Sequence, residues 1–454
     1  MTVEALRVTF ATGRTRPAAW RKDQLAGLRR MMKDGEAELI EALRLDLGRP
    51  RVEAFAADIG HTKAELRHLH RHVEKWMRPT RVHVPATAAP GTAHVVPEPL
   101  GVALVIAPWN YPIQLLVEPV AAALAAGNCV AAKPSELAPA CSAALARLLP
   151  RYVDPDALVV VEGGVEETTA LLAERWDHIF FTGSTAVGRV VAEAAAKHLT
   201  PTTLELGGKS PTYVHATADL DVAARRIAWG KFLNAGQTCI APDYVLADRS
   251  IRDDLVDRLV AEVGSFYGAE PQHSASFGRI VNQRHVERLQ RLLDSGAGTV
   301  AAGGTVDAAD RFVAPTITVD PPAGSAVMEE EIFGPILPVL AVDGPDEAVA
   351  FINARPKPLA LYVFAQDHDQ ADWVLERTSS GGVCVNQTLM HLLPPDLPFG
   401  GVGDSGSGGY HGKAGFDAFS HHRSVLRKGT RPDVKLLYPP YGRLAEGLVR
   451  RLLR

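Results

Sequence analysis

The spacing of apolar and polar residues divides the chain into a helical beginning and a longer part in which strands alternate with helices. In residues 25–45 apolar positions recur every three or four residues and charged residues fill the gaps, so residues 16–80 are predicted to be helical. From residue 99 short apolar runs alternate with amphipathic stretches. These predict strands at 101–107, 129–132, 158–161 and 178–181, and helices at 113–126, 138–149, 166–174 and 186–197.

A second series with the same alternation begins near residue 210. It predicts strands at 212–214, 243–247 and 336–341, and helices at 219–235, 250–267 and 282–294. Strands separated by helices of this length form parallel sheets covered by helices on both faces. We therefore expect an α/β protein with two doubly wound, Rossmann-like parallel-sheet domains.

Two short segments fit neither series. Residues 81–98 alternate like a hairpin around a Pro-Gly turn, and residues 420–428 also resemble a strand. An isolated two-stranded arm is marginally stable, so it needs a partner sheet. The last segment, 442–454, has leucines at helical spacing with arginines between them. A helix on a membrane surface and a terminal helix packed on the enzyme or on a partner subunit both fit this pattern, and we favour the second.

Composition narrows the class of protein. A chain of 454 residues is longer than one ordinary domain, and a net charge of −4 gives no reason to expect a nucleic-acid partner. The four cysteines form no Cys-x-x-Cys pair, so we expect neither a metal site nor a disulfide framework; they are Cys129, Cys141, Cys239 and Cys384. The beginning of the chain lacks a signal-peptide pattern, and a free reactive thiol suits a reducing compartment, so we expect a cytoplasmic protein.

One cysteine and one glutamate stand in unusual surroundings. Cys239 ends the segment Asn-Ala-Gly-Gln-Thr-Cys (234–239), and Glu205 lies in the apolar, glycine-flanked segment 203–211. A thiol can attack a carbonyl, and a buried carboxylate has the raised pKa that a general base needs near neutral pH. The plainer alternatives are an inert buried cysteine, and a glutamate paired with a cation such as Lys209.

These two segments, in this order and spacing, resemble the nucleophile and general-base motifs of the aldehyde dehydrogenase superfamily. Five further blocks resemble that family in the same order: 108–112, 133–136, 181–188, 330–335 and 397–402. The segments 355–362 and 420–426 are most similar to the class 3 branch of the family.

The resemblance implies a catalytic role for three residues. Cys239 would attack an aldehyde, and the amide of Asn110 would stabilise the resulting oxyanion together with the backbone N–H of Cys239. Glu205 would activate water to hydrolyse the thioester. A purely structural Asn110, shaping the turn before Pro112, is the alternative.

The electron acceptor implied is NAD, with NADP tolerated. The segment 183–188 follows a predicted strand and opens a helix, so the helix N-terminus can face a pyrophosphate, although its Gly-x-x-x-x-Gly spacing is a weak signal. A carboxylate at Glu136 would bind a ribose hydroxyl and repel a 2′-phosphate. The cofactor-binding residues implied are Trp109, Lys133, Glu136, Gly183, Ser184, Gly188, Leu206, Glu331 and Phe333.

A mostly apolar substrate tunnel is expected, which suits medium-chain aliphatic or aromatic aldehydes. Its predicted lining is Tyr111, Gln114, Leu115, Leu389, His391 and Leu392. Three alternatives remain open: a coenzyme A-acylating dehydrogenase, which usually lacks a glutamate at the position of Glu205, a non-catalytic binding protein on the same fold, and a cysteine hydrolase without cofactor.

The resemblance also implies a domain division. Residues 1–80 and 99–206 would bind the dinucleotide, and 207–391 would form the catalytic domain. Residues 81–98 and 392–430 would form a bridging arm that joins two copies into a homodimer, and 431–454 would form a C-terminal tail.

Overall fold

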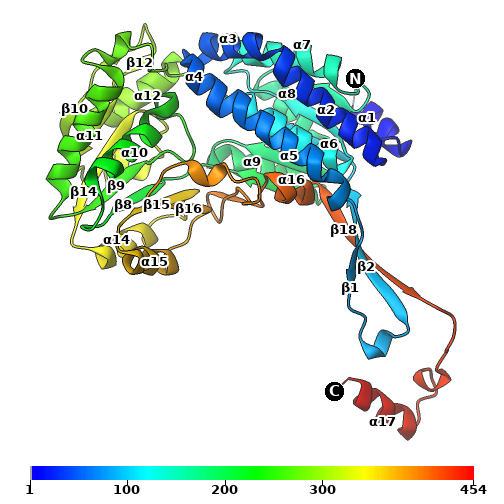
Figure 1. Ribbon diagram of the computed structural model, residues 1–454. Coiled ribbons are helices and arrows are strands. Elements are labelled where there is room, and N and C mark those ends of the chain that lie inside the picture. Colours follow the sequence, from blue (N-terminus) through cyan, green and yellow to red (C-terminus); the bar gives the residue numbers. More distant parts are fainter. Residues whose placement is uncertain (1–2, 454) are drawn as a thin grey trace.

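The structure is a computed structural model that describes residues 3–453. Two sheets lie side by side, and a narrow arm projects from one of them (Figure 1). The first sheet has six strands in the order β17-β7-β6-β3-β4-β5. They are β3 (Val102–Ile106), β4 (Cys129–Lys133), β5 (Leu158–Val160), β6 (His178–Thr182), β7 (Thr202–Glu205) and β17 (Gly406–Ser407).

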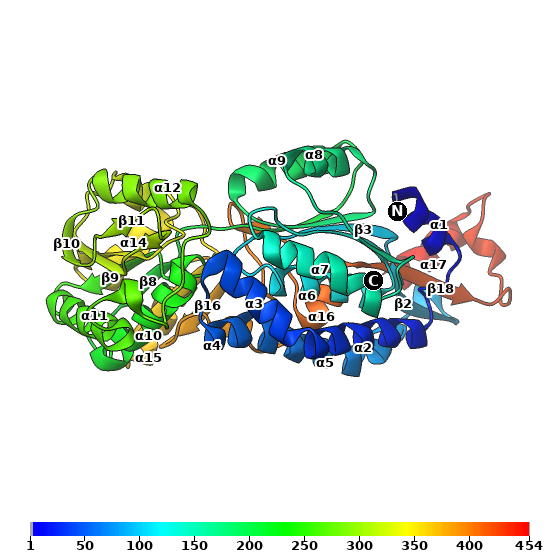
Figure 2. The ribbon, with the colours of Figure 1, turned by 90° about the horizontal axis from the view of Figure 1, so that it is seen from above.

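Helices cover both faces of this first sheet, as Figure 2 shows. On one face lie α6 (Gln114–Ala126) and α7 (Pro139–Tyr152), and on the other lie α8 (Val165–Ala173) and α9 (Thr185–Ala196). The beginning of the chain packs outside α6 and α7. It comprises α1 (Val3–Ala11), α2 (Ala18–Asp34), α3 (Glu36–Leu47), α4 (Arg51–Glu53), the π-helix η1 (Ala54–Gly60) and α5 (His61–Trp76).

The second sheet has seven strands in the order β10-β13-β14-β9-β8-β15-β16. They are β8 (Pro211–Val214), β9 (Tyr244–Asp248), β10 (Thr299–Ala302), β13 (Thr316–Val319), β14 (Ile336–Val342), β15 (Ala360–Phe364) and β16 (Gly382–Val385). The helices of this half are α10 (Leu220–Phe232), α11 (Arg252–Tyr267), α12 (Gln283–Asp294), α13 (Ala326–Glu329), α14 (Pro345–Asn353) and α15 (His368–Arg377). A two-stranded ribbon, β11 (Val306–Asp307) with β12 (Phe312–Val313), lies apart from both sheets.

The expected α/β class with two helix-covered sheets is confirmed, with one difference. Each sheet is parallel except for one antiparallel edge strand, β17 against β7 and β10 against β13. The apolar-run pattern did not predict β7, β10, β13, β15 or β16. The helix expected at 219–235 ends earlier, at Phe232, because Asn234 and Ala235 take left-handed backbone angles.

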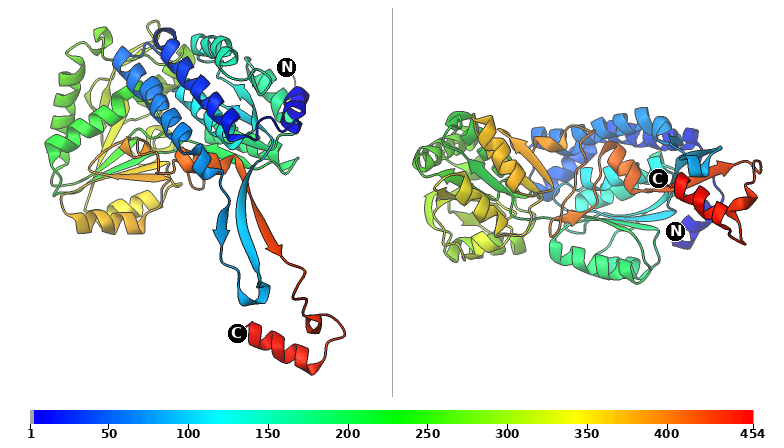
Figure 3. Two further views of the ribbon diagram at one scale, coloured as in Figure 1. Left: turned by 45° about the vertical axis from the view of Figure 1, so that its right-hand side comes forward. Right: turned by 90° about the horizontal axis from the view of Figure 1, so that it is seen from below.

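The two segments that fit neither series meet in one antiparallel arm, formed by β1 (Thr80–Val82), β2 (Gly91–Pro99) and β18 (Ser420–Lys428). β18 pairs with β2 along its full length, from Ser420 opposite Pro99 to Lys428 opposite Gly91. Beyond the arm, the short helices η6 (Lys435–Leu437) and α17 (Arg443–Leu452) lie near its far tip (Figure 3). Within residues 3–453 we find no helix long and apolar enough to cross a membrane.

Candidate active site

The segment that carries Cys239 begins with a sharp reversal of the chain. After α10, the short helix η3 (Leu233–Gly236) contains Asn234 and Ala235 at φ 52° and Gly236 at φ 75°. Left-handed angles are costly for residues other than glycine, so the surrounding structure must hold them. At position 236 only glycine fits, because a Cβ there would lie 2.3 Å from the carbonyl oxygen of Gly334.

Two buried amides of the motif hold this reversal. The Asn234 side-chain amide donates to the carbonyl oxygens of Asn110 (3.0 Å) and Gln237 (3.1 Å). The Gln237 side chain donates to the Asn234 carbonyl oxygen (2.9 Å) and accepts from the backbone N–H of Val281 (2.9 Å). The Asn-x-Gly-Gln spacing before Cys239 is therefore a structural requirement of the turn.

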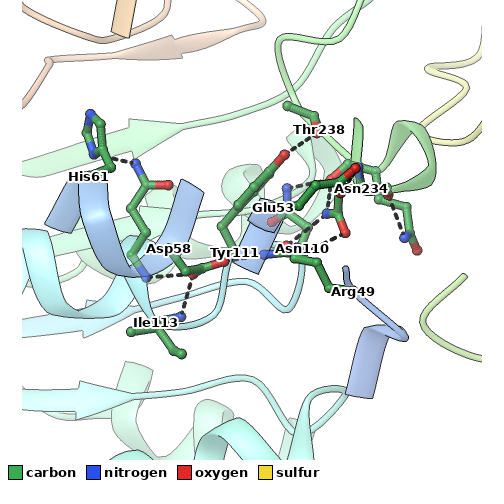
Figure 4. A network of polar contacts seen from close by, with 11 residues as sticks. Arg49, Glu53, Asp58, His61, Asn110, Tyr111, Ile113, Asn234 and Thr238 are labelled. Carbon is green, nitrogen blue, oxygen red and sulfur yellow. Dashed lines mark hydrogen bonds and ion pairs between the residues drawn. The ribbon is translucent and has the colours of Figure 1, made fainter. Parts of the chain in front are cut away.

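A buried arginine, Arg49, ties this turn to the helical beginning of the chain (Figure 4). Its guanidinium forms an ion pair with buried Asp58, donates to the Asn110 carbonyl oxygen, and donates to the Asn234 side-chain oxygen at 3.1 Å. Its central carbon also lies 4.6 Å from the centre of the Tyr111 ring. One cation thus fixes both loops that flank the nucleophile.

Sequence reasoning did not single out Arg49. No local pattern separates a buried arginine from the many exposed ones around it, since its burial depends on partners far along the chain. Asp58 extends the same network, because it also accepts hydrogen bonds from the backbone N–H groups of Ile113 (3.2 Å) and Gln114 (2.9 Å).

Asn110 lies against the nucleophile segment, as the sequence predicted. Its buried side-chain amide donates to the carbonyl oxygen of Gln237 at 3.0 Å. This bond uses one of the two amide protons and sets the orientation of the other. The neighbouring Trp109 ring lies 5.3 Å from the ring of Phe333, edge to face, and 5.0 Å from that of His285.

Glu205 ends β7 in an apolar environment. Its side chain is buried, and neither carboxylate oxygen has a hydrogen-bond partner among residues 3–453. Burial without compensating donors raises its pKa well above that of an ordinary glutamate. The alternative partner, Lys209, instead pairs with Asp243 at 2.6 Å and donates to the Val327 carbonyl oxygen at 2.8 Å.

Cys239 lies where two cavities meet. It lines an apolar cavity and also a second one, and Glu205 and Leu206 line both as well. Burial raises the pKa of the Cys239 thiol to about 12, with further contributions from the carboxyl groups of Glu331 and Glu205. The pKa of Glu331 is itself raised to about 8 by burial and by Asp243. The free thiol is therefore protonated at neutral pH.

The second cavity continues into a cleft at the start of α9, which has the shape and chemistry for a dinucleotide. Ser184 caps α9 by accepting a hydrogen bond from the N–H of Val187 at 3.4 Å, and the open helix start faces the cleft. At Gly183 a Cβ would lie 2.5 Å from the Phe181 ring, so only glycine allows the backbone this position.

Most predicted cofactor residues line this cleft or the cavity that joins it to Cys239. Trp109, Lys133, Glu136, Gly183 and Ser184 line the cleft, and Leu206, Glu331 and Phe333 line the connecting cavity. The Lys133 ammonium lies 3.5 Å from the Glu136 carboxylate.

Gly188 has a packing role beside the cleft. A Cβ at this position would lie 2.5 Å from the Leu206 side chain, so glycine here lets α9 approach that residue closely. Sequence reasoning missed His285 and Arg288, which line both the cleft and the connecting cavity from α12.

The apolar cavity on the other side of Cys239 contains five of the six predicted substrate residues: Tyr111, Gln114, Leu115, Leu389 and Leu392. The sixth, His391, faces Cys384, with its Nδ1 3.3 Å from the sulfur. Its neighbour Met390 takes the place in the wall. The sequence did not predict several further wall residues: Glu53, His61, Trp229, Leu233, Ile240, Phe399, Tyr410 and His411.

Comparison with known proteins agrees with this arrangement. Residues 2–425 match the family model described as the aldehyde dehydrogenase family. The chain is 48% identical over 442 residues to rat (Rattus norvegicus) aldehyde dehydrogenase family 3 member A2, covering 96% of this chain and 90% of that protein. It is 47% identical over 441 residues to the rat dimeric NADP-preferring aldehyde dehydrogenase, covering 97% of each chain.

Among solved structures, the substrate-bound state of Staphylococcus aureus AldH superimposes with a TM-score of 0.97 at 43% identity, covering 100% of both chains. An NAD-dependent aldehyde dehydrogenase from Sinorhizobium meliloti superimposes with a TM-score of 0.87 at 30% identity, covering 95% of this chain and 87% of that one.

The buried ion pair predicts a large loss of stability on substitution of Arg49. Arg49→Met leaves Asp58 charged and unpaired in the interior, so we expect the free energy of unfolding to fall by about 3–5 kcal/mol. Denaturant unfolding followed by circular dichroism measures this change. The control is Arg44→Met, which removes an exposed arginine paired with exposed Glu41 on the preceding helix and should change stability little. Equal effects of the two substitutions would contradict the role given to Arg49.

Proposed function

Because this chain belongs to the aldehyde dehydrogenase family, we propose that Cys239, Asn110 and Glu205 carry out its reaction, the oxidation of an aldehyde to a carboxylic acid with NAD or NADP. The observation that carries the proposal is the position of Cys239. Its thiol lies where an apolar cavity, able to hold an aldehyde, meets a cavity that leads to the dinucleotide cleft.

In the first step the Cys239 thiol loses its proton and the sulfur forms a bond to the aldehyde carbon. The electron pair of the carbonyl moves to oxygen and forms an oxyanion. The free N–H of the Asn110 amide and the backbone N–H of Cys239 stabilise this charge, an effect typically worth 10²–10³ in rate for one donor. The hydrogen bond to the Gln237 carbonyl oxygen orients Asn110 before the substrate arrives.

A bound dinucleotide supplies a nicotinamide ring that accepts hydride from the aldehyde carbon. Cys239 is then joined to the acyl group as a thioester. Glu205 takes a proton from water, the oxygen of that water adds to the acyl carbon, and the carbon–sulfur bond breaks to release the acid and the Cys239 thiolate. The lack of hydrogen-bond donors around Glu205 favours this base role, because its raised pKa matches proton uptake near neutral pH.

The presence of Glu205 also favours water over coenzyme A as the acyl acceptor, since a carboxylate poised beside the thioester has no use in direct transfer to a thiol. The dinucleotide cleft argues against a cysteine hydrolase. Retention of the three catalytic residues argues against a non-catalytic binding protein.

For the cofactor we propose NAD as the preferred dinucleotide, with NADP also used. Glu136 lies at the rim of the cleft, where its carboxylate can accept a hydrogen bond from a ribose hydroxyl and repel a 2′-phosphate. Nearby Lys133 reduces that repulsion, which is consistent with use of both. The apolar walls of the substrate cavity favour medium-chain aliphatic or aromatic aldehydes.

We propose the domain division expected from the sequence, with the arm joining two copies. Strands β3 to β7 lie within residues 99–206 and strands β8 to β16 within 207–391, which supports that division. β18 is an edge strand of the arm with mostly exposed side chains, and a free edge of this kind pairs readily with a strand of a second copy. A free catalytic thiol favours the cytoplasm as its location.

Substitutions of the two reacting groups should separate the half-reactions. Cys239→Ala should abolish formation of the reduced cofactor, because no thiohemiacetal forms. Glu205→Gln should still give a burst of reduced cofactor, close to one equivalent per active site, and then lose most steady-state turnover. Stopped-flow absorbance measures both phases. Equal loss of burst and turnover in Glu205→Gln would contradict a role in thioester hydrolysis.

The raised pKa of Glu205 predicts the pH dependence of turnover. A general base acts in its deprotonated form, so turnover should fall as the pH is lowered through a pKa well above the usual glutamate value of about 4.3. The acid limb of the kcat profile measures this pKa. Turnover that stays constant down to the range of an ordinary carboxyl group would show that Glu205 is not the rate-limiting base.

The arm predicts a dimer. Light scattering on the eluting protein should give about twice the 48.7 kDa mass of one chain. Leu426→Asp places a charge on the arm at a leucine that is 55% exposed, and it should weaken the dimer. Leu199→Asp, at a leucine 91% exposed outside the arm, is the matched control and should leave the mass unchanged. A monomeric parent chain would exclude the proposed assembly.

A further inference from the structure

One wall of the otherwise apolar substrate cavity contains a polar cluster that the oxidation does not use. At its centre is Glu118 of α6, a carboxylate with 1% of its side chain exposed. His61 Nδ1 lies 2.8 Å from one Glu118 oxygen, and His411 Nε2 lies 3.4 Å from the other. Thr62 also donates a hydrogen bond to Glu118, at 3.3 Å. The carboxylate therefore anchors two imidazoles from distant parts of the chain.

Both imidazoles line the cavity, and so does the amide of Gln114, whose nitrogen lies 3.2 Å from His61 Nδ1. The His61 and His411 rings are 5.4 Å apart, so the three side chains form one polar patch. The other nitrogen of His61, Nε2, lies 3.3 Å from the Leu392 carbonyl oxygen. Both ring nitrogens of His61 thus have an acceptor in reach, which favours the doubly protonated ring.

A patch of this kind is costly to bury beside apolar walls. Polar groups in contact with an alkyl chain lose water without gaining a new partner. Neither the attack by Cys239 nor the hydrolysis through Glu205 requires these residues. The cost is recovered only if the substrate itself brings a polar group to this wall.

The surrounding charges decide which polar group fits. Glu53 lines the same cavity, and Glu65, which accepts a hydrogen bond from the N–H of Gly412 at 2.7 Å, lies beside Glu118 and His61. Three carboxyl groups near the patch would repel an anionic substrate tail. The charge of His61 is already matched by Glu118. A neutral hydroxyl group suits the site best, because it can accept from an imidazole N–H and donate to the Gln114 amide oxygen.

We propose that His61, Gln114 and His411, held by Glu118, form a recognition site for a neutral hydroxyl group on the aldehyde chain. The enzyme then prefers hydroxylated aldehydes to plain alkyl aldehydes of the same length. This inference rests on the proposed function of the cavity, since it requires the aldehyde to lie there. Glu118 acts through the histidines and is a positioning residue.

The test compares octanal with octanals hydroxylated at mid-chain and at the terminal carbon, and with the corresponding ω-oxo carboxylate. In the parent enzyme we expect at least one hydroxylated octanal to have a kcat/KM roughly tenfold above that of octanal, and the carboxylate to be the poorest substrate. His61→Phe should raise KM for the hydroxylated aldehyde and bring the ratio of the two kcat/KM values close to one. Its kcat for octanal should persist.

Two further variants keep the test decisive. Gln114→Met removes the amide while keeping its bulk and leaves no buried charge unpaired, so it should fold and also reduce the preference. His72→Phe, on α5 like His61 but outside the cavity, should leave the preference unchanged. The inference is overturned if octanal and its hydroxylated forms react equally in the parent enzyme, or if both cavity variants retain the preference. Loss of all aldehyde oxidation in the parent enzyme would refute the proposed function instead.

Discussion

The buried guanidinium of Arg49 is the interaction on which the active site depends. It joins three stretches of chain that lie far apart in sequence: the helical beginning through Asp58, the loop of Asn110, and the turn of Asn234. Each loop alone has left-handed or irregular backbone and would be mobile. Because one cation bonds to all three, the position of Asn110 relative to Cys239 is set before substrate binds, which is the preorganisation that oxyanion stabilisation requires.

The second constraint is exclusion of water from the catalytic groups. The same burial that raises the pKa of Glu205 to suit a base also raises the pKa of the Cys239 thiol. One environment therefore helps the second half-reaction and hinders the first. The two half-reactions take place with different occupants in the cavities, so the electrostatic setting of the free enzyme is not the one in which the sulfur attacks. Glu331, whose pKa is raised to about 8, lies between the two cavities' chemistry and couples them.

Local patterns were sufficient for part of this structure. Apolar runs located β3, β4 and β6, because central parallel strands are buried on both faces, and motif context located Cys239, Glu205 and Asn110. Edge strands such as β10 lack that continuous apolar pattern, so they were missed. The Arg49 network and the cluster around Glu118 could not be predicted, because each depends on partners more than fifty residues away in the chain or on the packing of α5 against α6. His391 shows the same limit at one residue, since no pattern tells which side of a loop a ring will face.

The raised thiol pKa of Cys239 has a consequence for the survival of the enzyme between turnovers. Oxidation by peroxides and exchange with disulfides proceed through the thiolate, so a sulfur that stays protonated reacts slowly with both. Burial raises the pKa of Cys129, Cys141 and Cys384 as well. The resting protein is then chemically quiet under oxidative stress, the condition in which lipid breakdown would supply it with aldehydes.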